Sequence, residues 1–227
     1  MIKLDKVSKT FGTGVSGLLD ISIKVERGEF VFVVGPTGSG KTTLFRLLIR
    51  DMMPSSGSII IGDIDLMKLP KKKIPHLRKK IGVVFQDLKL LSDRTIFENI
   101  ILPLEVAGTD ADSAKKRVDE LLLQVNIEVH RNKFPIQLSG GELQRTAIAR
   151  ALVLSPDILL ADEPTGNLDP ATSKEIIKLL QEINEKGTTI VMATHNVDIV
   201  NALKKRVITF EKGKLIRDEK KGKYELS

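Results

Sequence analysis

The residues with the clearest chemical potential form a glycine-rich loop near the start of the chain. Residues 35–42, Gly-Pro-Thr-Gly-Ser-Gly-Lys-Thr, match the pattern G-x-x-x-x-G-K-[ST], between an apolar run typical of a strand and a stretch with a helical pattern. Glycines let backbone N–H groups surround phosphate oxygens, and a helix start adds a favourable dipole. We therefore predict that Lys41 reaches the β- and γ-phosphates of a nucleotide and that the Thr42 hydroxyl binds Mg²⁺.

A second candidate phosphate site lies in the other half of the chain. Leu-Ser-Gly-Gly-Glu (138–142) opens a helical pattern, so that Ser139 and the two glycines would present a hydroxyl and uncovered N–H groups at a helix start. A structural interpretation is also open, because Ser139 followed three residues later by Glu142 is the pattern of a capping box. Capping and phosphate binding are compatible.

Two acids follow an apolar run further along the chain. Ile-Leu-Leu-Ala (158–161) predicts a buried strand, and Asp162 and Glu163 stand at its end. Successive side chains of a strand point in different directions, so the two carboxylates can have different tasks. Acids at strand ends are often ordinary surface residues, and the phosphate-binding loop in the same chain is what favours a catalytic role.

The elements that must position these residues alternate between strands and helices, which predicts an α/β fold. Apolar runs at 30–35, 81–85, 157–162 and 188–194 are typical of strands covered on both faces, whereas residues 2–7 and 19–25 alternate with period two and predict antiparallel strands. Helices are expected at 111–125, at 140–154, and from Asp169-Pro170 to about Lys186, where Gly187 ends the last one. We interpret residues 1–227 as one domain, with a nucleotide-binding core (1–86 and 157–227) and an inserted helical subdomain (87–156).

Composition excludes several classes of protein. The 227 residues include no cysteine, which rules out a disulfide scaffold and thiolate metal sites. No apolar run reaches the roughly 18 residues of a membrane span, and we expect a chain that is soluble by itself. The net charge of +7 is concentrated in residues 68–80 and in the tail from Lys212. Such charge could face nucleic acid, anionic lipid or only water.

Taken together, the loop at 35–42 and the Leu-Ser-Gly-Gly-Glu motif resemble those of an ABC ATPase, and the resemblance covers nearly the whole chain. It implies a P-loop NTPase core of ABC ATPase type, with an N-terminal antiparallel β subdomain and an inserted helical subdomain. In that family the signature motif of one subunit closes over the ATP held by the P-loop of another. The resemblance therefore implies Mg²⁺-dependent ATP hydrolysis by a homodimer with ATP sandwiched at its interface.

The resemblance also implies roles for single residues. Asp162 would hold Mg²⁺, usually through water, and Glu163 would polarise the attacking water. Gln86 would contact Mg²⁺ or water, His195 would bond the γ-phosphate, and Phe11 would stack on adenine in place of the more usual tyrosine. The implied catalytic set is Lys41, Gln86, Glu163 and His195, and the implied metal set is Thr42, Gln86 and Asp162. The implied ATP-binding set is Phe11, Gly35, Pro36, Thr37, Gly38, Ser39, Gly40, Lys41, Thr42, Thr43, Ser139, Gly140, Gly141, Glu142 and Asp169.

Within the family, the chain resembles the ATPases of bacterial cell division. The segments that carry this resemblance are 74–78, 84–91, 93–95, 98–99 and 103–106. It implies an integral membrane partner, a peripheral location on the cytoplasmic face of the membrane at the division site, and activation of cell-wall hydrolysis. An ATPase of a lipoprotein-releasing or macrolide-efflux transporter would look similar. A soluble nucleic-acid-associated ATPase is a distant alternative, because the basic clusters lack the interleaved aromatic residues that stack on bases.

The segment after Gln86 is where such ATPases meet their membrane partner. We predict that Asp87–Val106 forms this surface, with Leu88, Leu90 and Leu91 in an exposed apolar groove that takes a partner helix. The alternative is that these leucines pack inside the helical subdomain. The basic cluster Lys71–Lys80 is expected to add only an auxiliary attraction to anionic lipid.

Overall fold

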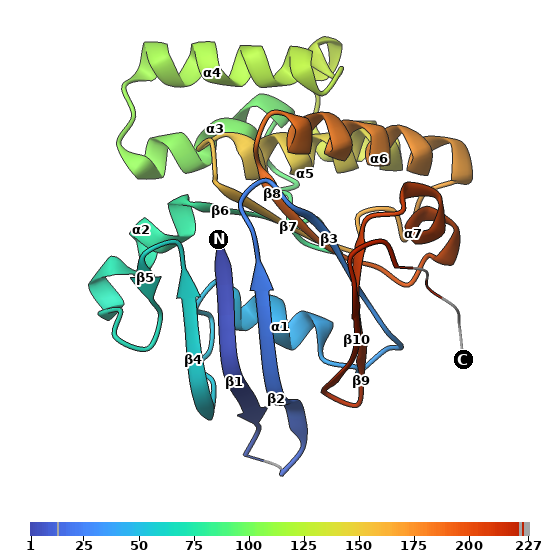
Figure 1. The fold of residues 1–227 in the computed structure, drawn as a ribbon. Helices are drawn as coiled ribbons and strands as arrows, with labels where there is room; N and C mark the ends of the chain where they lie inside the picture. Colours follow the sequence, from blue (N-terminus) through green and yellow to red (C-terminus); the bar gives the residue numbers. More distant parts are fainter. Residues whose placement is uncertain (13, 223, 225–227) are drawn as a thin grey trace.

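The computed structural model describes residues 1–12, 14–222 and 224. In this part of the chain the strands form two sheets, and helices lie between the sheets and above the larger one (Figure 1). The α/β class predicted from the alternating pattern is confirmed.

The larger sheet positions most of the chemically interesting residues. Its strands β3, β6, β7, β8 and β9 run parallel, and β10 pairs with β9 in the antiparallel sense. Parallel strands present their carboxyl ends at one edge, so the residues that follow β3, β6, β7 and β8 meet there. The spatial order is β10 (Lys214–Glu219), β9 (Arg206–Glu211), β3 (Phe30–Val34), β8 (Thr189–Ala193), β7 (Ile158–Asp162) and β6 (Ile81–Val84).

The smaller sheet is antiparallel and belongs to the first third of the chain. Its order is β2 (Ser16–Val25), β1 (Ile2–Thr10), β4 (Ser56–Ile61) and β5 (Ile64–Asp65). Alternate side chains along β1 and β2 are buried, as the period-two pattern predicts. Helix α1 (Lys41–Leu48) lies between the two sheets, and its apolar face packs into a cluster shared by both. The helix start is therefore fixed from two sides.

Four longer helices lie on the other side of the large sheet. Helices α3 (Ile96–Ala107), α4 (Ala111–Gln124), α5 (Gly140–Leu152) and α6 (Pro170–Glu185) share one buried apolar cluster with the side chains of β3, β7 and β8. The helices expected at 111–125, at 140–154 and after Pro170 are present, whereas α3 was not predicted as a separate element. Short elements complete the set: η1 (Lys71–Lys73), α2 (Ile74–Lys79), η2 (Glu128–His130), η3 (Pro135–Gln137) and α7 (Val197–Leu203).

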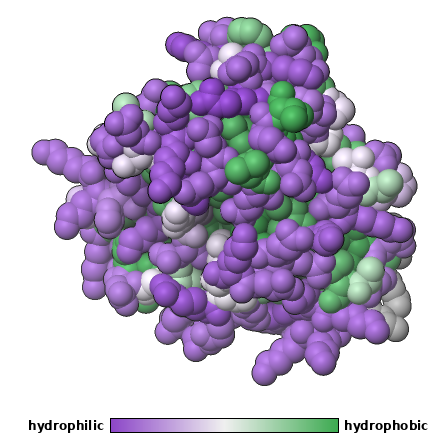
Figure 2. All heavy atoms as spheres, turned by 90° about the horizontal axis from the view of Figure 1, so that it is seen from above, coloured by the Kyte–Doolittle hydropathy of each residue, from purple (hydrophilic) through white to green (hydrophobic). Residues whose placement is uncertain are grey.

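The outer surface above these helices is mostly hydrophilic, and apolar side chains show only in scattered patches (Figure 2). This follows from the amphipathic pattern of α4, whose buried face holds Ala114, Val118, Leu121 and Leu122. Among the described residues, no helix has both the length and the apolar character needed to cross a bilayer. The boundaries proposed for the helical subdomain, 87–156, stay a prediction.

Candidate functional site

The glycine-rich loop connects β3 to α1 by a backbone path that requires glycine at two points. Gly35 has a φ of 142°, and a Cβ there would collide with the carbonyl oxygen of Phe210. Gly40 has a φ of 113° and is the N-cap of α1, but it has no side chain to cap the helix. The first N–H groups of an α-helix lack partners within the helix, so those of α1 stay open to an anion.

The ammonium group of Lys41 lies inside this loop. Its Nζ donates to the carbonyl oxygens of Gly35 at 2.7 Å and Pro36 at 3.1 Å, and only 9% of the residue is exposed. Burial lowers the pKa of Lys41, while the charges of Glu163 and Asp162 oppose that shift. The two carbonyl oxygens offer Lys41 only the negative ends of their dipoles. A phosphate group in the loop would offer it a full negative charge.

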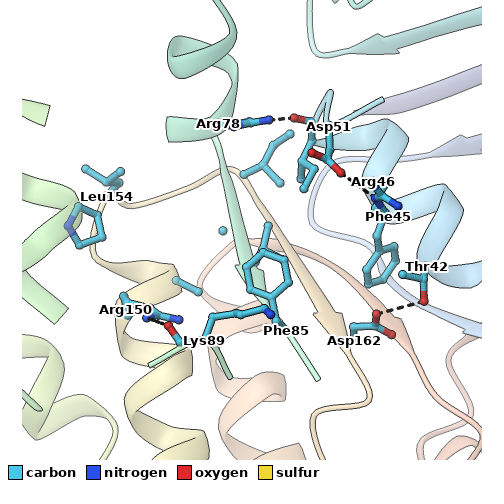
Figure 3. A pocket seen from close by; sticks show the side chains of 16 residues that line it. Thr42, Phe45, Arg46, Asp51, Arg78, Phe85, Lys89, Arg150, Leu154 and Asp162 are labelled. Atoms are coloured by element: carbon cyan, nitrogen blue, oxygen red, sulfur yellow. Dashed lines mark hydrogen bonds and ion pairs between the residues drawn. The ribbon is translucent and has the colours of Figure 1, made fainter. Parts of the chain in front are cut away.

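Two carboxylates stand across from the lysine at the end of β7. The hydroxyl of Thr42 donates to Oδ2 of Asp162 at 3.4 Å (Figure 3). Burial and the charge of Glu163 raise the pKa of Asp162, against the opposing effects of Thr42 and Lys41. Thr42 and Asp162 offer a hydroxyl and a carboxylate oxygen side by side, and Mg²⁺ prefers such hard oxygen ligands. The donor set therefore fits the metal expected from the sequence.

Glu163 is held in place by the neighbouring strand. Its backbone has a φ of 48°, in the left-handed region, and its N–H donates to the carbonyl oxygen of Ala193 at 2.9 Å. Nδ1 of His195 lies 2.8 Å from Oε1 of Glu163, and the His195 backbone N–H donates to Oε2 at 3.4 Å. The Glu163 side chain is 10% exposed and that of His195 is 65% exposed. The histidine thus orients a nearly buried carboxylate while its own ring remains accessible.

A cavity of about 330 Å³ gathers these groups. Its walls contain most of the residues predicted around Lys41. Gly35 and Pro36 do not line it, but their carbonyl oxygens accept hydrogen bonds from Lys41, which does. The predicted residues in the cavity wall are Phe11, Thr37, Gly38, Ser39, Gly40, Lys41, Thr42, Thr43, Gln86, Asp162, Glu163 and His195.

Sequence reasoning missed one stretch of this wall. Val15, Ser16 and Gly17 line the same cavity from the start of β2. Gly17 has a positional role, because a Cβ there would stand 2.7 Å from the ring of Phe11. These three residues belong to no motif and come into the site only through the pairing of β1 with β2, so no local signal could have indicated them.

Ser139, Gly140, Gly141, Glu142 and Asp169 line a different cavity, of about 270 Å³. None of them lines the cavity beside Lys41, so one chain does not bring its two candidate phosphate sites together. Ser139 forms the capping box that the structural interpretation predicts: its N–H and its hydroxyl both donate to Oε2 of Glu142 at 2.7 Å. Arg145 also lines this cavity.

A third cavity, of about 650 Å³, forms a groove around Phe85, the residue before Gln86 in the sequence (Figure 3). Phe85, 38% exposed, stands in it together with Lys89 and apolar side chains of α1 and α5. The residues that line this groove are Thr42, Phe45, Arg46, Ile49, Asp51, Arg78, Ile81, Gly82, Val83, Phe85, Lys89, Pro103, Arg150, Ala151, Leu154 and Asp162.

Leu88, Leu90 and Leu91, which were predicted to stand in an apolar groove, do not line this one. Leu88 packs against the buried cluster of the large sheet, and Leu91 is 40% exposed outside the groove. The reason is the backbone: Leu88 and Lys89 both have positive φ, 57° and 53°, and Arg150 donates to both carbonyl oxygens. This tight turn directs Leu88 inward and leaves Phe85 and Lys89 in the groove.

Comparison with known proteins identifies the family to which this chain belongs. The family model described as ABC transporter matches residues 18–166. The cell division ATP-binding protein FtsE of Bacillus subtilis is 52% identical over 224 residues, which cover 99% of this chain and 98% of that protein. The chain belongs to the ABC transporter family, in its FtsE group. FtsE of Mycobacterium tuberculosis is 47% identical, again covering 99% of this chain and 98% of the relative.

A solved structure agrees with membership of the ABC transporter family. The dimeric structure of the ATP-binding cassette MJ0796 in a post-hydrolysis state, bound to ADP and Pi, matches with a TM-score of 0.89 and 36% identity. The match covers 99% of this chain and 100% of that one. The predicted P-loop NTPase fold of ABC ATPase type is therefore confirmed.

The loop geometry gives a first prediction. Gly35→Ala should lower the free energy of unfolding by at least about 2 kcal/mol, because a Cβ meets the Phe210 carbonyl and φ is positive. Gly12→Ala is the matched control: a Cβ there meets open space and φ is not positive, so the change should stay within about 0.5 kcal/mol. Urea unfolding of both variants measures the difference, and equal stabilities would contradict this account of the loop.

Proposed function

We propose that this chain is the ATP-binding and hydrolysing subunit of a bacterial cell-division ABC complex of FtsEX type. One observation carries the proposal: the P-loop with its two carboxylates and the Ser139 motif line separate cavities, each incomplete as a nucleotide site. FtsE relatives 42–52% identical favour cell division over the lipoprotein-releasing and macrolide-efflux alternatives.

The residues around Lys41 suit the binding of ATP. The open N–H groups at the start of α1 and the Lys41 ammonium face the space where the phosphates would lie, and Phe11 stands on the same cavity wall for the adenine. Mg²⁺ would be held by Thr42, by Asp162 through water, and by Gln86. When bound, it neutralises charge on the β- and γ-phosphate oxygens.

Hydrolysis requires a water molecule aligned with the γ-phosphate. Glu163 is the group proposed to polarise this water, because its nearly buried carboxylate shares the cavity with Lys41 and Gln86. His195 holds Glu163 through Nδ1, which leaves the exposed side of its ring for the γ-phosphate. The left-handed backbone of Glu163 is a conformation that costs energy, and such strain is common at sites whose geometry matters.

The second cavity supplies the other half of the site. We propose that Ser139, Gly140, Gly141 and Glu142 of one protomer close over the ATP held by its partner, with Asp169 nearby at the start of α6. The dimeric cassette MJ0796 supports this assembly. Two equal composite sites then arise in a homodimer, and closure of the dimer converts ATP binding into motion.

The groove around Phe85 is the surface proposed for an integral membrane partner of FtsX type. It joins the ATP site directly, since Thr42 and Asp162 line the groove as well as the nucleotide cavity. The protein would then act on the cytoplasmic face of the membrane at the division site. Movement of the partner would activate cell-wall hydrolysis rather than transport a substrate.

The roles of the carboxylate and the lysine can be separated. Glu163→Gln should keep ATP bound while hydrolysis falls roughly hundredfold or more, the usual effect of losing a general base. Lys41→Ala should instead weaken ATP binding, because the phosphates lose their cation. Steady-state hydrolysis and equilibrium binding measure the two effects. Hydrolysis by Glu163→Gln at the parental rate would show that another group is the base.

The composite site predicts a specific complementation. Lys41→Ala and Ser139→Arg chains should each be inactive alone, because every homodimer lacks one half of each site. Mixed, they should regain ATP hydrolysis through the one site that joins an intact P-loop to an intact Ser139 motif. Light scattering of Glu163→Gln should show ATP-dependent dimers, and a monomer at all ATP concentrations would contradict the proposal.

The groove and the basic cluster are expected to contribute differently to membrane association. Phe85→Asp should abolish co-purification with the partner while ATP binding persists, because it places a charge in the apolar groove. Reversing Lys71, Lys72 and Lys73, all exposed, should cost little, because lipid attraction of about 1 kcal/mol per Lys fades within a Debye length.

Flotation with anionic liposomes, with and without the partner, measures both effects. Ile216→Asp is the matched control, an exposed apolar side chain on β10 that does not line the groove. Salt-sensitive flotation that ignores the partner would assign membrane binding to the basic cluster instead of the groove.

A further inference from the structure

A histidine from outside the Ser139 motif contacts its glutamate. Nε2 of His130 lies 2.7 Å from Oε1 of Glu142, and the two side chains are only 17% and 32% exposed. His130 ends η2, a short turn after α4, ahead of the loop that leads to Ser139. The contact therefore joins the body of the helical region to the start of α5.

The contact completes the set of donors around one carboxylate. The Ser139 N–H and hydroxyl both donate to Oε2 of Glu142, and Nε2 of His130 contacts Oε1. These hydrogen bonds to Ser139, with a smaller effect of the His130 charge, lower the pKa of Glu142, which is thus an ionised acceptor. If the Ser139 hydroxyl turns to a phosphate, Glu142 keeps the Ser139 N–H and His130 as donors.

The residues that follow His130 are held by neighbouring elements. The Arg131 carbonyl oxygen accepts from Phe97 N–H at 3.0 Å, and the Lys133 carbonyl oxygen accepts from Ile96 N–H at 2.8 Å. The Arg131 guanidinium lies 3.8 Å from the centroid of the Phe97 ring and pairs with Asp119 of α4. The turn that carries His130 is therefore fixed to α3 and α4.

The start of α3 also follows a segment that reaches the proposed membrane-partner surface, since Lys89 lines the groove. Residues 87–94 lead directly into α3. Thr95 is the N-cap of this helix and forms a capping box with Glu98. The chain of contacts thus runs from this segment, through Phe97 and Arg131, to His130 and Glu142.

We propose that His130 is a positioning residue for the Ser139 motif: by donating from Nε2 to Glu142, it holds the start of α5 in the geometry that receives the partner protomer's ATP. The inference rests on the proposed composite site. It goes beyond it by assigning a role to a residue outside every motif and by linking the motif to the α3 side of the molecule.

The test uses the complementing pair of chains, because only one composite site is active there. That site joins the P-loop of the Ser139→Arg chain to the Ser139 motif of the Lys41→Ala chain. His130→Leu placed on the Lys41→Ala chain should lower hydrolysis about tenfold, as expected for loss of a hydrogen bond to a charged group. Placed on the Ser139→Arg chain, the same change affects a motif that is already inactive and should leave the rate of the mixture unchanged.

Two further variants separate the hydrogen bond from packing. His130→Gln on the Lys41→Ala chain keeps an N–H donor and should recover most of the rate. His76→Leu on the same chain replaces an exposed histidine of α2 and should have no effect. Thermal unfolding of each chain, and ATP binding by His130→Leu alone, should match the parent.

The outcomes are distinct. Equal loss of rate from both placements of His130→Leu, or no loss from either, would overturn the positioning role while leaving the composite site intact. Absence of hydrolysis in the parental mixture of Lys41→Ala and Ser139→Arg would overturn the composite site, and the inference with it.

Discussion

The structure depends on holding one ammonium and two carboxylates, partly buried, at one edge of a sheet. Burial lowers the pKa of Lys41 and raises that of Asp162, so each charge is costly to keep there by itself. The opposite charge of the other group lowers this cost for each of them. The carbonyl oxygens that accept from Lys41 and the Thr42 hydroxyl that donates to Asp162 lower it further. Nucleotide phosphates and a divalent cation would complete this balance with stronger partners. The nucleotide-free protein therefore keeps charges in place for a ligand at some expense of stability.

The rest of the fold supplies the rigidity that this arrangement needs. The parallel order β3, β8, β7 and β6 brings four strand ends together, and α1 is packed between two sheets. Gly35 crosses so close to the Phe210 carbonyl that no side chain fits, which fixes the loop against β9. Glu163 is oriented from the next strand through His195 and Ala193. The chemistry thus relies on contacts between strands that are neighbours only in space.

The difference between local motifs and contacts made only in space explains what could be predicted from the sequence. The P-loop, the acids after β7 and the Ser139 motif are contiguous, and their local pattern carries their chemistry. The buried strands were predictable because parallel strands covered on both faces are continuous apolar runs. The contact between Gly17 and Phe11 depends on the register of the β1–β2 hairpin, and the contact between Glu163 and His195 depends on pairing between distant segments. No short sequence motif records either contact. The apolar pattern after Gln86 did not predict where the leucines lie. Two successive left-handed residues, Leu88 and Lys89, whose carbonyl oxygens bind Arg150, turn the Leu88 side chain toward the core. Helix α3 was missed although Thr95 and Glu98 form a capping box, since Pro103 inside it weakens the helical pattern.

The capping box at Ser139 illustrates how one set of atoms can serve structure and function together. In the single chain, the Ser139 hydroxyl is occupied by Glu142, so the motif is a helix start satisfied by its own side chains. A phosphate brought by a second protomer would compete for that hydroxyl. The competition is inexpensive only if Glu142 retains other donors, and the Ser139 N–H and His130 are the ones in reach. The carboxylate of Glu142 would then keep hydrogen-bond donors whether the anion site is empty or filled.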